Sequence, residues 1–149
     1  MASRLSTVLH ELISIEQGAF QKGKVIFENI GVASELTNMM FAKCRGGGMG
    51  MKLDIQKAFN ILDLSYLFDV LCAFGFSPIW VSWVHQILLS TRISVLINRC
   101  PVGFFGVERG LRQGDPLSPL MFILSKEVLC RGLSALREMG WLNALPGPR

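Results

Sequence analysis

The chain has 149 residues, of which 50% are apolar and 17% are charged. This is the size of one ordinary domain, and the composition excludes a disordered chain because the apolar residues suffice for a buried core. The formal net charge of +4 and the isoelectric point near 9.1 suit a polyanionic partner without proving one.

A membrane segment and a secretory signal are both disfavoured, although the mean hydropathy is high at +0.42. The longest nearly uncharged run, residues 70–84, is shorter than the ~20 residues that span a bilayer, and a Ser-Pro pair divides it. Residues 1–14 lack the apolar region of a secretory signal, which predicts an intracellular protein, nuclear or cytoplasmic. The four cysteines and two histidines lack the spacing of zinc ligands.

The N-terminal third of the chain predicts two helices. Apolar residues recur at helical spacing over residues 3–13, and residues 14–23 then have the character of a loop. A rough 3.6-residue period predicts a second helix over about 26–43. The glycine-rich stretch 44–50 ends it and marks a flexible connection.

The middle of the chain predicts a strand followed by two helices. The short apolar run 51–55 indicates a strand entering the core, and from about residue 57 the pattern turns helical as far as Gly75, a natural helix end. Ser77 is a good N-cap and Pro78 a good first helical residue. The helix that they begin should run to about Leu89.

The C-terminal half predicts a hairpin, a stiff loop and a helix. Residues 92–98 alternate and are β-branched, and 102–107 could pair with them across a turn at 99–101. Residues 109–120 form a loop dense in glycine, proline and arginine, after which Asp115 or Ser118 should cap a helix reaching residue 136. Residues 140–149 are turn-rich. Because no βαβα rhythm is present, the fold class predicted is α+β.

Asp54 is a lone carboxylate at the end of the apolar run 51–55. Buried charges are normally paired or bound to metal, so a metal ligand is one interpretation. An ion pair with Lys52 or Lys57, or an N-cap for the next helix, is the other. The pattern alone favours the second interpretation.

The loop 109–120 carries a second group of candidate residues. Gly110 and Gly114 allow close backbone approach, and Gln113 offers both donors and an acceptor. Arg109 and Arg112 offer forks that match phosphate. Together these features suit the phosphate of a nucleotide or nucleic acid, while a rigid turn with surface arginines is the alternative.

These stretches carry a family resemblance. KLDIQKAFN (52–60) and RGLRQGDPLSPLMFIL (109–124) resemble the two palm motifs of the reverse transcriptase domain of non-LTR (LINE-type) retrotransposons, particularly those of plants. Residues 2–36, 92–105 and 125–133 resemble further parts of that domain in the same order. The resemblance implies a partial right-hand polymerase over residues 1–149, with helices packed on a small antiparallel sheet. Fingers would occupy about 1–48, and a fingers/palm portion about 49–149.

The resemblance also implies roles for individual residues in two-magnesium nucleotidyl transfer. Asp54 and the backbone carbonyl of Ile55 would bind Mg²⁺. Phe59 would be the aromatic gate that selects deoxynucleotides, or simply a core phenylalanine. The expected nucleotide-binding residues are Lys57, Ala58, Phe59, Gln113 and Gly114, and the candidate phosphate or template contacts are Lys24, Arg109 and Arg112. Lys24 stands where the family usually has arginine, and a solvated lysine is its alternative.

The chain departs from the family in one chemically decisive respect. The aromatic-Ala-Asp-Asp hairpin that supplies the remaining carboxylates is absent, and no Asp-Asp pair occurs in the 149 residues. We therefore expect a truncated, inactive part of an RNA-directed DNA polymerase without a thumb. Its family-implied partners are an RNA template, a DNA primer and deoxynucleoside triphosphates. The alternative is a non-catalytic nucleic-acid or protein interaction module, and exposed apolar surface predicts self-association.

Overall fold

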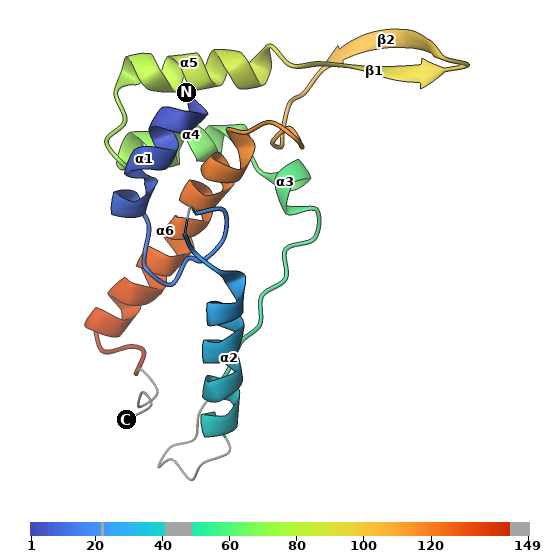
Figure 1. Ribbon diagram of the computed structural model, residues 1–149. Helices are drawn as coiled ribbons and strands as arrows, with labels where there is room; N and C mark the ends of the chain where they lie inside the picture. Colours follow the sequence, from blue (N-terminus) through green and yellow to red (C-terminus); the bar gives the residue numbers. More distant parts are fainter. Residues whose placement is uncertain (22, 41–48, 144–149) are drawn as a thin grey trace. The chain divides into compact units, whose positions relative to one another are not determined.

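The computed structural model describes residues 1–21, 23–40 and 49–143. The chain divides into two compact units, here called unit 1 (residues 1–55 and 126–149) and unit 2 (residues 56–125). Helices predominate, and a two-stranded antiparallel sheet is the sheet found in the described ranges (Figure 1). This content of helices and antiparallel strands confirms the predicted α+β class.

Unit 1 contains α1 (Ala2–Leu12), α2 (Ile26–Met40) and the C-terminal part of α6 (Ser118–Glu138). In α1, Leu5 and Leu9 are buried, so their four-residue spacing forms the apolar stripe that the sequence predicted. In contrast, α2 begins where expected but has no buried residue. The predicted extension of α2 to residue 43 lies outside the described residues, as does most of the glycine-rich segment.

The predicted strand at residues 51–55 is wrong. The chain there has no regular secondary structure, and Leu53 and Ile55 are 61% and 45% exposed. A strand is stabilised by backbone hydrogen bonds to a neighbouring strand. Within the described part of the chain no strand pairs with this run, so the hydrogen bonds that would stabilise a strand are missing.

Unit 2 begins with two helices where the sequence predicted one. α3 (Ala58–Ile61) and α4 (Leu64–Ala73) are separated because Asp63 is in an extended conformation and caps α4, its carboxylate accepting a hydrogen bond from the Tyr66 N–H at 3.0 Å. The expected end of α4 near Gly75 is confirmed. Gly75 has φ +83°, and the N–H groups of Gly75 and Phe76 donate to carbonyls in the last turn of the helix.

The next helix confirms its sequence signals. α5 (Pro78–Leu89) has proline at its first position, and the Ser77 hydroxyl accepts a hydrogen bond from the Trp80 N–H at 3.3 Å. α4 and α5 pack together, with the Phe68 and His85 rings 4.7 Å apart. Among the described residues no helix is both long and apolar enough to cross a bilayer.

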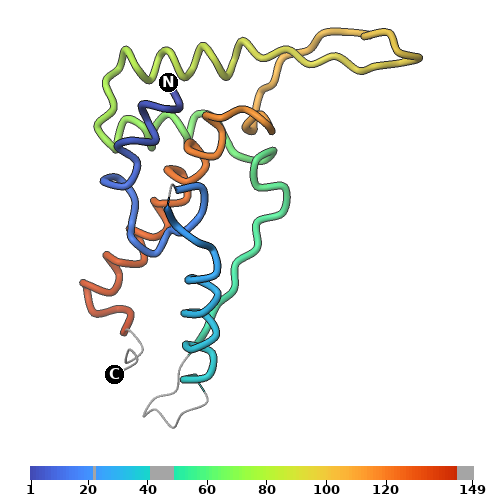
Figure 2. Tube along the Cα trace, viewed as in Figure 1, coloured from blue at the N-terminus to red at the C-terminus, as the bar shows by residue number. Residues whose placement is uncertain are grey.

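The hairpin consists of β1 (Arg92–Ile97) and β2 (Cys100–Gly106), and it extends beyond the end of α5 (Figure 2). Its turn is Asn98–Arg99, not residues 99–101, because Cys100 already pairs with Ile97. Both turn residues have positive φ, 51° and 67°, as a two-residue hairpin turn requires. Gly103, with φ +68°, sits where the register shifts between Ile93 and Val95, which marks a bulge.

The last helix, α6, follows the stiff loop. Of the two candidate caps, Asp115 is the one that bonds: its carboxylate accepts from the Leu117 N–H at 2.8 Å, whereas Ser118 lies inside the helix with its hydroxyl buried and unpartnered.

The core of unit 2 is formed by α4, α5, the loop and the first turns of α6. Its buried apolar residues are Leu64, Leu67, Val70, Leu71, Val84, Leu88, Leu111, Leu117, Leu120, Met121, Ile123 and Leu124.

Candidate functional site

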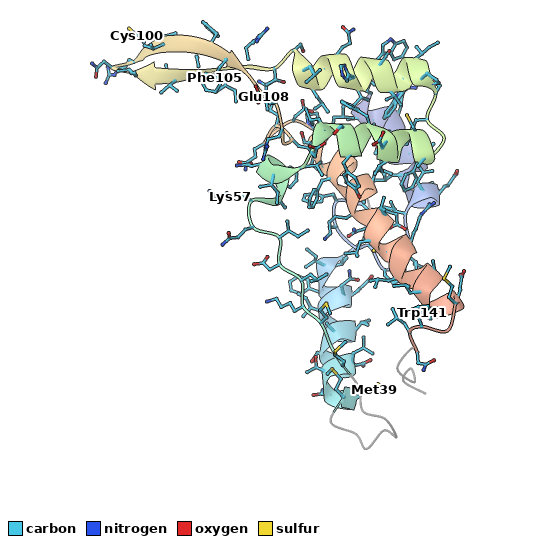
Figure 3. The ribbon with its side chains drawn as sticks, turned by 180° about the vertical axis from the view of Figure 1, so that it is seen from behind. Met39, Lys57, Cys100, Phe105, Glu108 and Trp141 are labelled. Atoms are coloured by element: carbon cyan, nitrogen blue, oxygen red, sulfur yellow. The ribbon has the colours of Figure 1, made fainter. Side chains whose placement is uncertain are left out.

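The loop that follows the hairpin is fastened to α3 by two backbone hydrogen bonds. The Gly110 N–H donates to the Leu62 carbonyl at 2.7 Å, and the Leu111 N–H donates to the Phe59 carbonyl at 2.6 Å. Figure 3 shows Lys57 where the chain enters α3 and Glu108 where the hairpin leads into this loop. Within unit 2 these bonds bring the end of the first motif, at Phe59, next to the start of the second motif.

The glycine at position 110 is required by this contact. Gly110 has φ +86°, and a Cβ added there would lie 2.7 Å from the Asn60 carbonyl oxygen and 2.8 Å from that of Phe59. Both neighbours are backbone atoms and cannot move aside like a flexible side chain. The close approach expected of Gly110 is therefore confirmed, and its neighbour is α3.

A pocket of about 480 Å³ opens beside this contact. It is lined by the end of α5, the start of β1, Asn60 of α3 and the loop from Arg109 to Gln113. The guanidinium-bearing residues Arg92, Arg109 and Arg112 all line it, and none of its described lining residues is acidic. An unbalanced set of three cations makes the pocket suitable for an anion, and arginine forks match phosphate oxygens.

Polar contacts at the pocket rim support the same electrostatic picture. The Gln113 amide donates to the Asn60 side-chain oxygen across 3.5 Å, so these two residues meet although 53 positions separate them. Next to α3, the pKa of Asp63 is lowered by the Ser65 hydroxyl, the Tyr66 N–H and, more weakly, the positive charge of Arg109.

Phe59 packs on the core side of this region. Its ring stacks on that of Phe122 of α6, with centroids 4.9 Å apart and planes inclined by 23°, and its side chain is half-buried. Packing is thus one role of this ring. Its predicted role as a gate under a sugar stays a prediction.

The other predicted nucleotide-binding residues also lie in unit 2. Lys57 is exposed, precedes α3 and has a left-handed backbone with φ 49°, whereas Ala58 is half-buried in the first position of that helix. Gly114 has φ +86°, and a Cβ added there would meet nothing within 4 Å. These residues belong to the same unit as Gln113, and their binding roles stay predictions.

Asp54 and Ile55, the predicted magnesium ligands, belong to unit 1 and are exposed. Both structural alternatives for Asp54 are wrong in the described structure. It forms no ion pair with Lys52 or Lys57 there, and the N-cap of α3 is Lys57, which has no side-chain capping bond. A role of Asp54 as a metal ligand stays a prediction.

The donors present do not amount to a two-metal centre. The described residues contain no group of three or more His, Cys, Asp or Glu side chains that could hold a metal ion. Magnesium needs oxygen ligands in octahedral geometry, and a single exposed carboxylate supplies few of them. Asp54 alone does not fit the magnesium chemistry that the resemblance implies.

Lys24 lies in unit 1, and its ammonium group donates to the Ile15 carbonyl at 3.1 Å. Lys24 is also exposed, as its alternative interpretation as a solvated lysine expects. A contact of Lys24 with triphosphate or template stays a prediction.

Sequence reasoning missed Arg92 and Asn60 as members of the site. Asn60 stands at the end of the first motif, and Arg92 is the first residue of a strand. Their place in the pocket depends on the contact between the loop and α3, which no local pattern encodes. The signal that could have found Asn60 is its position in the same motif as Asp54.

Known proteins with similar sequences identify the family. Residues 1–137 match the family model described as reverse transcriptase (RNA-dependent DNA polymerase). The chain is 34% identical over 125 residues to an uncharacterized protein of transposon TX1 from Xenopus laevis, covering 83% of the chain and 9% of that protein. It is 35% identical over 81 residues to a Pol polyprotein of a type-2 retrotransposable element from Drosophila melanogaster, covering 54% of the chain and 8% of that protein.

A shorter match is closer in identity. An uncharacterized mitochondrial protein of Arabidopsis thaliana is 50% identical over 54 residues, which is 36% of the chain and 42% of that protein. The chain thus spans well under half the length of these relatives, and about a tenth of the transposon proteins. This chain belongs to the reverse transcriptase family and corresponds to a segment of the reverse transcriptases of non-LTR retrotransposons.

Proposed function

We propose that this chain is a nucleic-acid- and nucleotide-binding part of an RNA-directed DNA polymerase, and that it does not catalyse polymerisation by itself. The observation that supports it is the contact of Gly110 and Leu111 with α3, which places Gln113 against Asn60 beside three arginines. Its ligands would be an RNA template, a DNA primer and deoxynucleoside triphosphates. An intracellular location and a plant retrotransposon as source belong to the same proposal.

The proposed binding chemistry follows from the side chains. Arg92, Arg109 and Arg112 would bind phosphate oxygens through paired N–H donors. Gln113 and Asn60 offer amide donors and acceptors at the rim, which suits the sugar or base edge of a nucleotide. Neither interaction requires a metal ion, so binding can persist where catalysis is lost.

The proposed lack of catalysis follows from the missing carboxylates. In the family two magnesium ions hold the attacking and leaving oxygens. This chain has Asp54 at the first palm motif but no Asp-Asp pair. The division into a fingers portion at about 1–48 and a fingers/palm portion at about 49–149 also belongs to the proposal.

Binding is tested with a fluorescein-labelled DNA primer annealed to RNA, titrated with the full chain at several salt concentrations. We expect affinity to fall steeply with salt, and Arg109→Ala with Arg112→Ala to reduce the slope of log K against log salt by about 2. The charge-matched control is Arg4→Ala with Arg137→Ala, two exposed arginines of unit 1. Salt-independent binding, or an equal loss in the control, would contradict the proposed site.

Catalysis is tested by primer extension with magnesium, the same primed template and all four deoxynucleotides. We expect no extended product from the wild-type chain. Product that Asp54→Asn abolishes would show that the chain assembles a working centre, and the non-catalytic part of the proposal would then be wrong.

A further inference from the structure

The β1–β2 hairpin has one wholly apolar face. Alternation along β1 puts Ile93, Val95 and Ile97 on the same side of the strand. Their partners on β2 lie on the same side of the hairpin, because the side chains of directly opposed residues in a sheet point to the same face. We call this set the apolar face, and its members are Ile93, Val95, Ile97, Cys100, Val102 and Phe105.

Within the described structure nothing in unit 2 covers this face. Val95, Ile97, Val102 and Phe105 are 50–53% exposed, and Cys100 is exposed as well. A lone two-stranded hairpin is marginally stable in water, and contiguous exposed apolar patches mark interaction sites. The hairpin extends beyond the end of α5 (Figure 1).

We propose that the apolar face packs against the same face of a second copy of this chain. The area is sufficient: six side chains, each about half exposed, offer roughly 500 Å² per copy, and about 1,000 Å² in total is the lower bound for a specific interface. Two such faces stack like the sheets of a sandwich, about 10 Å apart. Because no charged residue lies on the apolar face, this packing buries no like charges.

Face-to-face packing is favoured over strand addition at the β2 edge. Ile97 and Cys100 close a two-residue turn, so the next pair, Leu96 and Pro101, directs its backbone groups outward. Proline has no N–H, so that edge lacks a donor where an added strand would need one. The bulge at Gly103 disrupts the same edge further along.

The charges at the two ends of the hairpin favour a copy of this chain over an unrelated partner. Arg99 lies at the tip and Glu108 just beyond the base, and neither side chain forms an ion pair in the described structure. In an antiparallel two-fold packing the tip of each hairpin lies near the base of the other. Arg99 then faces Glu108 of the second copy, and symmetry makes this contact twice.

The experiment is sedimentation of the full chain over a concentration series, with two matched double variants. Val95→Thr with Val102→Thr makes the apolar face polar while keeping β-branched residues in the strands. The control, Leu96→Thr with Phe104→Thr, removes apolar side chains from the opposite side of the hairpin that are more exposed, at 71% and 74%. We expect a wild-type dimer, a dissociation constant raised about tenfold or more by the first variant, and little change in the control.

The charge contact gives a second readout that does not depend on the apolar substitutions. Arg99→Glu should weaken the dimer, and Arg99→Glu combined with Glu108→Arg should restore it. A monomeric wild type at about 100 µM, assembly that grows past a dimer, an equal effect of the control variant, or no rescue by the exchanged charges would each overturn the proposal.

Discussion

At the scale of single residues, the site depends on backbone conformations that most amino acids avoid. Lys57 and Gly110 both have positive φ, and they lie on the two segments that meet at the pocket. For Lys57 this conformation is costly, which is typical of positions held by their surroundings. For Gly110 the positive φ carries no steric cost, and the absence of a side chain allows the loop to reach α3.

Gly110→Ala should destabilise the chain by about 1–3 kcal/mol, because it combines an unfavourable φ with a clash against backbone oxygens. Gly114→Ala is the matched control: its φ is also +86°, but an added Cβ meets nothing within 4 Å. We expect the control to lose less than half as much, measured by urea denaturation. Equal losses of unfolding free energy would show that the loop can shift to accept the added Cβ, and that the tight contact with α3 does not contribute to stability.

The residue scale also shows what sequence reasoning could find. The loop motif identified Gly110 and Gln113 because glycine and glutamine have recognisable backbone and hydrogen-bonding properties. The place of Arg92 in the pocket was not predicted, because an arginine at the start of a strand has no sequence signal that indicates binding. Its role arises from the chain returning to the base of the hairpin, which is a property of tertiary structure.

At the scale of elements, local signals succeeded where the stabilising partner is local. Gly75, Ser77 and Pro78 marked helix ends correctly because their capping bonds involve neighbours in sequence. Residues 51–55 failed because a strand requires a distant partner. The break between α3 and α4 was missed because the apolar periodicity continues across Asp63, whose capping bonds interrupt the helix.

The cap of α4 predicts a dependence of stability on pH. The folded state lowers the pKa of Asp63, so this group stabilises the fold above its unfolded pKa of about 3.9, and the contribution is lost as pH falls through the folded pKa. Asp63→Asn should flatten the fall of melting temperature below about pH 4. Identical pH profiles for wild type and Asp63→Asn would contradict the assignment.

At the scale of the whole molecule, unit 1 is closed by contacts between the beginning and the end of the chain. The Ser14 hydroxyl donates to the carboxylate of Glu127 at 2.8 Å, and the Arg131 guanidinium donates to the Leu12 carbonyl at 2.7 Å. The Glu127 carboxylate also lies 3.7 Å from Arg131. Glu127 is 2% exposed, so its charge is compensated by these two partners.

Glu127→Ala should cost about 1–3 kcal/mol of unfolding free energy, because the hydroxyl of half-buried Ser14 loses its acceptor and the arginine loses its nearby carboxylate. Glu138→Ala, an exposed change in the last turn of the same helix, should stay within about 0.5 kcal/mol. Thermal unfolding of both variants checks the difference. A Glu127 variant as stable as the control would mean that these contacts do not hold unit 1 together.

The hairpin and the Ser14–Glu127 contact differ in when they can form during synthesis. All pairings of the hairpin lie within residues 92–106, and hairpins form in about 1–10 µs. The contact to Ser14 requires residue 127, and the ribosome adds only about 5–20 residues per second. The apolar face is therefore presented to the cell on the order of a second before unit 1 can close. On a polysome, neighbouring nascent chains carry the same face, so copies can meet before either is complete.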